Sequence, residues 1–171
     1  IITAVFKTIH EKSLNQEYVA SAFSDYCELL IAEAREKDIH EQKNEFANKE
    51  FLSELLKYTI RAFFVSLRYP AYMGAALRCF AWYNAFKGRR DIARYFFMKS
   101  IAKHHLLGMK YEEAKSLREY GLFLDDCSKR SEAREYFTRA YLLFEKCGAK
   151  LETGRIAHRI DPAVVERNGA T

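Results

Sequence analysis

The sequence of 171 residues contains few of the residues that end secondary-structure elements, with 7 glycines and 2 prolines. All-β sandwiches and barrels need a turn signal about every 8–12 residues, so this scarcity argues against them. Glycines this isolated also do not form a glycine-rich phosphate loop. With 49% hydrophobic and 30% charged residues, the chain is neither intrinsically disordered nor fibrous. The composition therefore favours an all-α protein.

Long apolar runs are missing as well. No apolar stretch approaches the roughly 18 residues of a transmembrane helix, so we expect no membrane partner. The apolar residues 1–6 lack the basic start and the cleavage site of a signal peptide. The cysteines, Cys27, Cys79, Cys127 and Cys147, show neither C-x-x-C spacing nor the density of a disulfide scaffold. We expect buried, reduced thiols in a cytoplasmic protein, and the absence of Met at position 1 suggests a fragment of a longer chain.

The chain contains an internal repeat. Residues 74–113 align with residues 114–153 at an offset of 40 and share 9 identical positions, where unrelated segments would share about 2 or 3. In each unit two stripes of apolar residues at helical spacing flank a polar break, which predicts a helical hairpin. The identical pairs are Leu77 and Leu117, Arg78 and Arg118, Arg90 and Arg130, Ala93 and Ala133, Arg94 and Arg134, Phe97 and Phe137, Gly108 and Gly148, Lys110 and Lys150, and Glu112 and Glu152.

Local signals place the ends of these helices. Asp91 and Ser131 stand where N-caps of the second helices are expected, because their side-chain oxygens can accept free backbone N–H groups. Gly108 and Gly148 are predicted to end the second helices, where a positive φ is useful. The small residues predicted to allow close contact between the helices of a hairpin are Ala81, Ala93, Gly121 and Ala133.

Outside the repeat, the sequence predicts further helices in one domain of 171 residues. The box Ser13-Leu14-Asn15-Gln16 opens an amphipathic run that ends near Asp38, and a second helix is predicted from about Lys49 to Arg68. Asp161-Pro162 is predicted to stop the C-terminal helix and leave a frayed tail. The expected units are 1–12, the end of a preceding unit or a cap; 13–70, a degenerate hairpin; 74–113 and 114–153, the two repeats; and 154–171, a partial repeat and tail.

The order of residues in the second unit resembles the tetratricopeptide pattern of large, small and apolar residues followed by Ala, aromatic and Ala. These residues are Leu117, Tyr120-Gly121, Leu124, Ala133, Phe137 and Ala140; in the first unit they are Leu77, Phe80-Ala81, Ala93, Phe97 and Ser100. The common repeat has about 34 residues, and these units are longer by six. Together with the stretch Gly148 to Arg155, this length resembles the repeats of multidomain bacterial signal-transduction ATPases, nucleotide cyclases and transcriptional activators. The resemblance implies a right-handed α-α superhelix, a solenoid of antiparallel hairpins of about 40 residues.

The resemblance also implies a partner-binding groove, because the first helix of each tetratricopeptide hairpin lines the concave face. The candidate groove residues are Arg78, Trp82, Lys115, Arg118, Leu122, Arg155 and His158. Their cations would form a basic ladder suited to an acidic or C-terminal carboxylate peptide, since arginine offers paired donors to a carboxylate. Trp82, Tyr83 and Phe86 are expected to be exposed there. Alternatively, these cations are solvated helix faces or face a neighbouring domain.

No residue pattern argues for catalysis, a metal or a cofactor. The adjacent carboxylates of Asp125-Asp126 and Glu112-Glu113 point in different directions on a helix. His104-His105 lack the spacing of a metal site and are expected at the surface or partly packed. The net charge is +5, but the clustered cations lie in predicted turns without a recognition motif, so nucleic-acid binding is not expected.

We therefore expect a non-enzymatic scaffold for protein–protein or interdomain interaction in a signalling or regulatory protein. The alternative is a ligand-sensing regulatory domain of a transcriptional activator or signalling ATPase, which would respond to a small-molecule effector. A third possibility, a transfer enzyme built on helical repeats, requires a deep cleft with perturbed ionisable groups.

Overall fold

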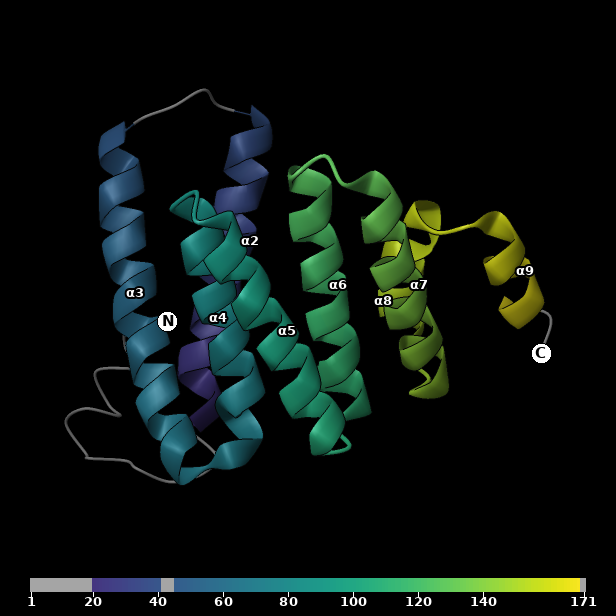
Figure 1. The fold of residues 1–171 in the computed structure, drawn as a ribbon, viewed down its shortest axis with the longest axis horizontal. Coiled ribbons are helices and arrows are strands. Elements are labelled where there is room, and N and C mark those ends of the chain that lie inside the picture. Colours follow the sequence, from purple (N-terminus) through teal and green to yellow (C-terminus); the bar gives the residue numbers. More distant parts are fainter. Residues whose placement is uncertain (1–19, 41–44, 170–171) are drawn as a thin grey trace.

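The computed structural model describes residues 20–40 and 45–169, which fold into helices with no strand among them (Figure 1). The expected all-α class is confirmed. The predicted unit 1–12 and the predicted box at residues 13–16 lie outside the described residues. The elements are α2 (Ala20–His40), α3 (Glu45–Arg68), the 3₁₀ helix η2 (Pro70–Tyr72), α4 (Met73–Phe86), α5 (Arg90–Leu106), α6 (Lys110–Asp126), α7 (Arg130–Lys146), α8 (Lys150–Ile156), the 3₁₀ helix η3 (Ala157–Arg159) and α9 (Pro162–Gly169).

Helices that follow one another in the chain pack against one another from α2 to α8, and along the long axis of the molecule α3 stands at one end and α9 at the other (Figure 1). In addition, α2 contacts α4, and α4 contacts α6. The first helices of successive hairpins therefore touch directly. This order of packing is compatible with a helical-repeat fold.

The four loops that follow α4, α5, α6 and α7 have one shared conformation. Each contains a residue with φ between 62° and 71°, at Gly88, Gly108, Ser128 and Gly148, twenty residues apart. In each loop the N–H of the next residue bonds the carbonyl five residues earlier, as from Arg89 to Asn84 at 2.9 Å. This is the Schellman arrangement, which satisfies carbonyls at a helix C-terminus. Gly108 and Gly148 end the second helices as predicted, and the loops within hairpins have the same geometry as those between them.

The predicted N-caps are wrong. The residues preceding α5 and α7 are Arg89 and Lys129, and neither forms a side-chain cap. The Schellman loops bring the chain into helical conformation at Arg90 and Arg130, so that Asp91 and Ser131 already lie inside the first turn. In that position Asp91 still interacts favourably with the helix dipole.

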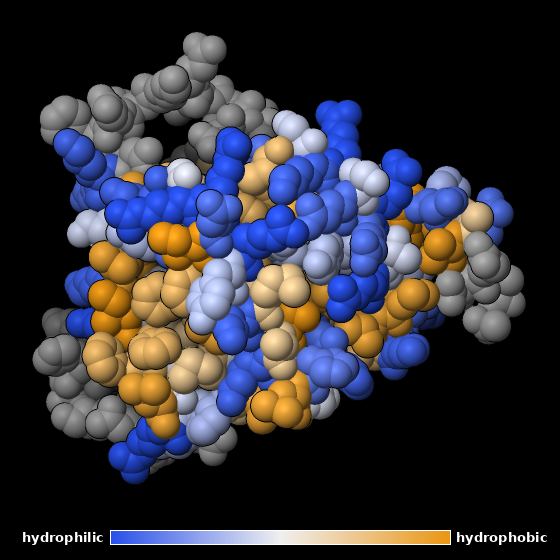
Figure 2. Space-filling model, in the orientation of Figure 1, coloured by the Kyte–Doolittle hydropathy of each residue, from blue (hydrophilic) through white to orange (hydrophobic). Residues whose placement is uncertain are grey.

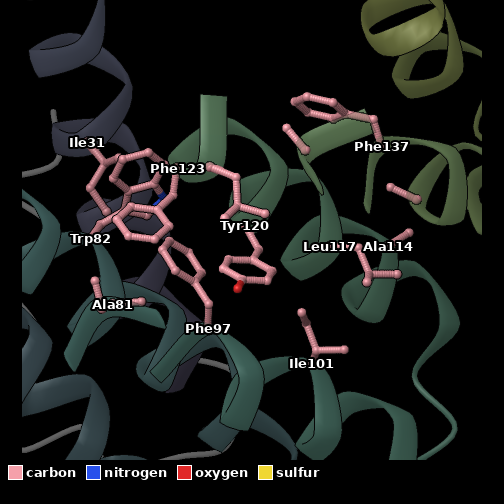
Figure 3. Close-up of a cluster of buried hydrophobic side chains, with 14 of the residues drawn as sticks. Ile31, Ala81, Trp82, Phe97, Ile101, Ala114, Leu117, Tyr120, Phe123 and Phe137 are labelled. Atoms are coloured by element: carbon pink, nitrogen blue, oxygen red, sulfur yellow. The ribbon is translucent and has the colours of Figure 1, made fainter. Parts of the chain in front are cut away.

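Aromatic side chains in contact with one another form much of the core of the repeats (Figure 3). Trp82, Phe97, Tyr120 and Phe123 pack with ring centroids 5.3–6.1 Å apart. All four small residues predicted at close contacts are buried. A Cβ on Gly121 would lie 2.8 Å from Cε1 of Phe137, so glycine at this position allows the two helices to approach.

The start of α3, the C-terminal segment and the burial of the cysteines differ from the prediction. Helix α3 begins at Glu45, four residues earlier than expected, and ends at Arg68 before Pro70 as predicted. The expected frayed tail is wrong for residues 162–169, which form α9; the Asp161 carboxylate accepts the N–H of Ala163 at 3.0 Å. The cysteines are free; Cys27 and Cys79 are buried as expected, whereas Cys127 is half-buried and Cys147 is exposed.

Candidate functional site

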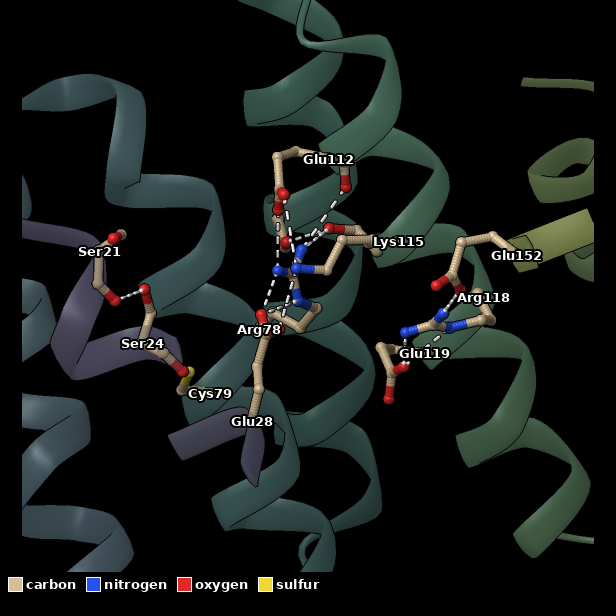
Figure 4. Close-up of polar contacts among 12 residues, drawn as sticks. Ser21, Ser24, Glu28, Arg78, Cys79, Glu112, Lys115, Arg118, Glu119 and Glu152 are labelled. Carbon is tan, nitrogen blue, oxygen red and sulfur yellow. Dashed lines mark hydrogen bonds and ion pairs between the residues drawn. The ribbon is translucent and has the colours of Figure 1, made fainter. Parts of the chain in front are cut away.

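The repeat identity of Arg78 with Arg118 and of Glu112 with Glu152 corresponds to a repeated ion pair. Arg78 on α4 pairs with Glu112 on α6, with Nη2 and Oε2 2.9 Å apart, and Arg118 on α6 pairs with Glu152 on α8 (Figure 4). Each pair joins the first helix of one hairpin to the first helix of the next. We call the contact of α4 with α6 the first junction and that of α6 with α8 the second junction.

At the first junction the Arg78 guanidinium is surrounded by acceptors. It donates to Glu28 on α2 and to Ser116 Oγ at 2.8 Å, in addition to Glu112. Burial of the Glu28 carboxyl favours its neutral form, but the positive charges of Arg78 and Lys115 outweigh this and hold the Glu28 pKa at about 2. The same carboxylates raise the pKa of Arg78 against its burial. Arg78 is therefore a fixed buried cation.

Lys115 belongs to the same ion-pair network. Its Nζ lies 2.9 Å from a Glu28 oxygen and 3.4 Å from a Glu112 oxygen. Burial and the charge of Arg78 both lower the Lys115 pKa, but the two carboxylates outweigh them and raise it. Two cations and two carboxylates thus compensate each other between α2, α4 and α6, which leaves neither predicted cation unpaired for a partner.

A buried polar cluster completes the first junction. Ser100 Oγ bonds the carbonyl of Gly74 at 2.7 Å and Ser116 Oγ at 2.9 Å, and Ser116 Oγ lies 3.0 Å from His104 Nδ1. His104 is fully buried, and burial together with the charge of Arg78 lowers its pKa to about 4. The expectation that His104 lies at the surface or is only partly packed is therefore wrong, whereas His105 is exposed.

Trp82 is buried, which corrects the expectation that it is exposed in the groove. Its Nε1 donates to Glu119 at 3.0 Å, and its ring packs at right angles to Phe97. Arg35 on α2 lies over the indole, with its guanidinium carbon 4.4 Å from the ring centroid. Tyr83 and Phe86 are half-buried.

A groove of about 1110 Å³ lies between α2, α4, α6, α8 and η3. It brings together six of the seven predicted site residues: Arg78, Trp82, Arg118, Leu122, Arg155 and His158. Lys115 is not part of its lining. Apolar residues also line it, among them Ile31, Phe86 and Ile156.

Most of the charged groups in the groove already have protein partners. Arg35 reaches from α2 to Asp126 on α6 at 2.6 Å, and Arg159 on η3 pairs with Asp125 at 2.6 Å. Arg118 also pairs with Glu119, and Arg155 with Glu152. The predicted basic ladder is thus an alternating network that holds first helices together.

Two arginines in the lining are different. Arg90 and Arg130 are the first residues of α5 and α7 and occupy equivalent positions in the two repeats. Both are exposed, and neither forms an ion pair with any residue that the structure describes. They are the lining cations best placed to meet a partner's carboxylates.

Sequence reasoning missed Glu28, Ser116 and the buried position of His104. Two signals were present: Glu28 is a charged residue in the stripe of buried residues Ser24, Cys27 and Ile31, and identical Arg and Glu residues recur together at one offset. Across the described residues, no group of His, Cys, Asp and Glu is arranged to hold a metal ion. None of the described helices combines the length and the hydrophobicity of a membrane span.

Comparison of the chain with protein-family models, curated proteins and solved structures gives no match.

Proposed function

We propose that this chain is a non-catalytic, tetratricopeptide-like scaffold of right-handed superhelical form that binds an acidic protein segment in the groove. The 40-residue repeat, the consecutive packing of the helices and the shared loop geometry support the repeat architecture. Four free thiols support a reducing, cytoplasmic setting. The partner is a peptide segment of another protein or of a flanking domain in a signalling protein.

The observation that carries this function is the combination of partly apolar walls with two unpaired arginines at equivalent repeat positions, Arg90 and Arg130. Packed helices lie about 8–10 Å apart, and an extended peptide advances about 3.3 Å per residue. The ion pair of Arg94 on α5 with Glu132 on α7 shows that the helices opened by the two arginines are neighbours, so carboxylates about three residues apart in an extended segment suit Arg90 and Arg130. Leu122 and Phe86 offer apolar contacts in the same groove.

The test uses fluorescence anisotropy with a labelled extended peptide that carries acidic residues three positions apart around an apolar residue. The double variant Arg90→Glu and Arg130→Glu is expected to weaken its binding at least about tenfold, because two attractive contacts become repulsive. The matched control is Arg134→Glu with Lys146→Glu, two exposed cations of α7 outside the groove lining. Equal affinity in the groove variant and the control would contradict the proposal.

The groove volume favours a second candidate, a small-molecule effector site. About 1110 Å³ is close to the upper end of ligand sites, roughly 300–1,000 Å³. A metabolite that binds there would raise the melting temperature in a thermal-shift screen, and the rise would be lost in Leu122→Arg. A screen with no stabilising compound counts against this candidate and leaves the peptide proposal standing.

A further inference from the structure

Charge is unevenly distributed along the chain. Residues 55–111 contain 11 lysines and arginines but a single acidic residue, Asp91, whereas the remaining residues contain 17 basic and 22 acidic residues. The stretch that covers most of α3, all of α4 and all of α5 is therefore strongly cationic in a chain whose remainder is acidic. Such a one-signed region favours a partner of opposite charge.

Most cations of this stretch have no carboxylate partner among the described residues, although Lys57, Arg61, Arg68 and Lys99 lie over tyrosine rings. Arg78 is buried at the first junction, and Arg94 pairs with Glu132 at 2.6 Å. The others form no carboxylate ion pair with a described residue. They are Lys57, Arg61, Arg68, Lys87, Arg89, Arg90, Lys99, Lys103 and Lys110.

Large apolar side chains are exposed among these cations. On α3, Phe64 is 65% and Leu67 58% exposed, with Ile60 beside them; on α5, Tyr95 is 56% exposed, with Ile92 nearby. Apolar residues gather on the side of the molecule formed by α3, α4 and α5, with hydrophilic residues around them (Figure 2). This α3–α5 surface consists of Ile60, Phe64, Leu67, Ile92 and Tyr95 together with Lys57, Arg61, Arg68 and Lys99.

A continuous row of aromatic contacts joins the two helices of the α3–α5 surface. Phe64 packs against Phe63, Phe63 against Phe80 on α4, and Phe80 against Phe96 on α5, with centroids 5.4–6.3 Å apart. Tyr95 then packs against Phe96 at 5.5 Å. The exposed side chains of α3 and α5 therefore belong to one surface rather than to two isolated patches.

The spacing of the exposed residues on α3 indicates that the partner bound to the α3–α5 surface is a helix. Lys57, Ile60, Phe64 and Leu67 follow one another at intervals of three, four and three residues, which is the a and d spacing of a helix seam. Arg61 and Arg68 then occupy the e positions, where partner helices place opposite charges. Neither a lipid bilayer nor a nucleic acid requires this register.

We propose that the α3–α5 surface docks an acidic amphipathic helix of a partner protein. Its apolar a and d residues would pack against Ile60, Phe64 and Leu67, and its carboxylates would pair with Arg61 and Arg68. This surface is separate from the groove, because none of its residues belongs to the groove lining. One chain can then hold an extended acidic segment in the groove and a helix on α3.

The test measures binding of the 171-residue chain to a labelled, stapled helical peptide with Leu at positions a and d and Glu at positions e and g. Phe64→Glu is expected to weaken binding at least about tenfold, because it removes an apolar contact and adds repulsion. Arg61→Glu with Arg68→Glu is expected to abolish binding of this peptide and to restore binding to a peptide with Lys at e and g. Two controls should bind normally, Leu151→Glu, at an exposed leucine of α8, and Arg130→Glu, in the groove.

Several results would overturn the proposal. The proposal is overturned if the wild-type chain does not bind the acidic helix, or if it binds a scrambled peptide of the same composition equally well. It is also overturned if the Phe64→Glu variant binds the acidic helix as tightly as the wild-type chain does. If the chain binds only vesicles of phosphatidylcholine and phosphatidylserine, and Phe64→Glu abolishes that binding, the surface is assigned to a membrane instead. If it binds only a thymidine oligonucleotide in a Phe64-dependent way, the surface is assigned to nucleic acid. Dimerisation lost in Phe64→Glu, seen by sedimentation, would assign it to a second copy. Circular dichroism confirms that each variant is folded.

Discussion

At the first junction the Arg78 side chain is 1% exposed, whereas at the second junction its repeat counterpart Arg118 is 18% exposed. Both arginines pair with the equivalent glutamate of the next first helix. The difference comes from α2, which adds Glu28 to the first junction and covers it. The arginine of the pair is thus buried where a preceding helix packs over it and partly solvated at the second junction, whereas its glutamate is 26% exposed at the first junction and 12% at the second.

The residues around the two ion pairs differ in polarity. Ser100, His104 and Ser116 at the first junction correspond, at the offset of 40, to Ala140, Phe144 and Ile156 at the second. Gly74, which allows His104 to approach, corresponds to Ala114. The ion pair is therefore a feature of the repeat, and the buried polar cluster is specific to the first junction.

Replacing the arginine should give the largest difference in stability loss between the two junctions. Arg78→Met is expected to lower the free energy of unfolding by about 3 kcal/mol, because the guanidinium, which is 1% exposed, gives up its bonds to two half-buried carboxylates that keep only Lys115 as a cation. Arg118→Met should cost about 1 kcal/mol, since Arg118 is itself partly solvated and its carboxylate partners keep other donors, Arg155 and the Trp82 N–H. Urea unfolding of both variants measures the difference, and equal losses would contradict the account.

Acid should destabilise the first junction through His104. Its pKa is about 4 in the folded protein and 6.5 as the ordinary value, so the unfolded chain takes up the proton first as the pH falls. The stabilisation is complete above pH 6.5 and is lost between pH 6.5 and 4, by about 3 kcal/mol. Below pH 4.5, protonation of Glu28, whose folded pKa is about 2, lowers stability further.

The repeat itself supplies the control for this pH dependence. His104→Phe introduces the residue that the second junction carries at the equivalent position, Phe144. Urea unfolding from pH 7.5 to 4 should show a smaller decrease for this variant than for the unaltered chain. A decrease of the same size in both would show that His104 does not titrate as proposed.

A single added methyl group should also disturb the packing of the first junction. In Gly74→Ala the new Cβ would lie 2.5 Å from Cδ2 of His104, and overpacking of this kind costs about 1–3 kcal/mol. Gly154→Ala is the matched control, because no atom lies within 4 Å of its Cβ, and there the helix should gain up to about 1 kcal/mol. Thermal unfolding compares the two, and stabilisation by Gly74→Ala would contradict the packing of the first junction.

The fold was predictable from the sequence where the same residue types recur at the repeat offset. The offset of 40 located the hairpins, and Gly108 and Gly148 located two of the loops. The equivalent loop at Ser128 could not be found in this way, because serine rarely adopts a positive φ and carries no signal for it. The helix starts were misplaced by two residues at Asp91 and Ser131, because the Schellman loops end each helix and begin the next within three residues.

The position of the candidate site was predictable from the sequence, but the ion-pair partners of its charged residues were not. Six of seven candidates line one groove, since equivalent positions of first helices come together in a repeat. Their pairing was not predictable, because the partner of Arg78 on α2 lies 50 residues away and outside the repeat. Exposure of Trp82 was wrongly predicted for the same reason, since Arg35 and Glu119 on other helices cover it.

The central claim is that one ion pair, repeated every 40 residues, links consecutive first helices. The most direct test is a pair of double-mutant cycles by urea unfolding, with Arg78→Met and Glu112→Gln at the first junction and Arg118→Met and Glu152→Gln at the second. We predict favourable coupling in both cycles, between about 0.5 and 3 kcal/mol and larger at the first junction. Coupling near zero at both junctions would contradict the account.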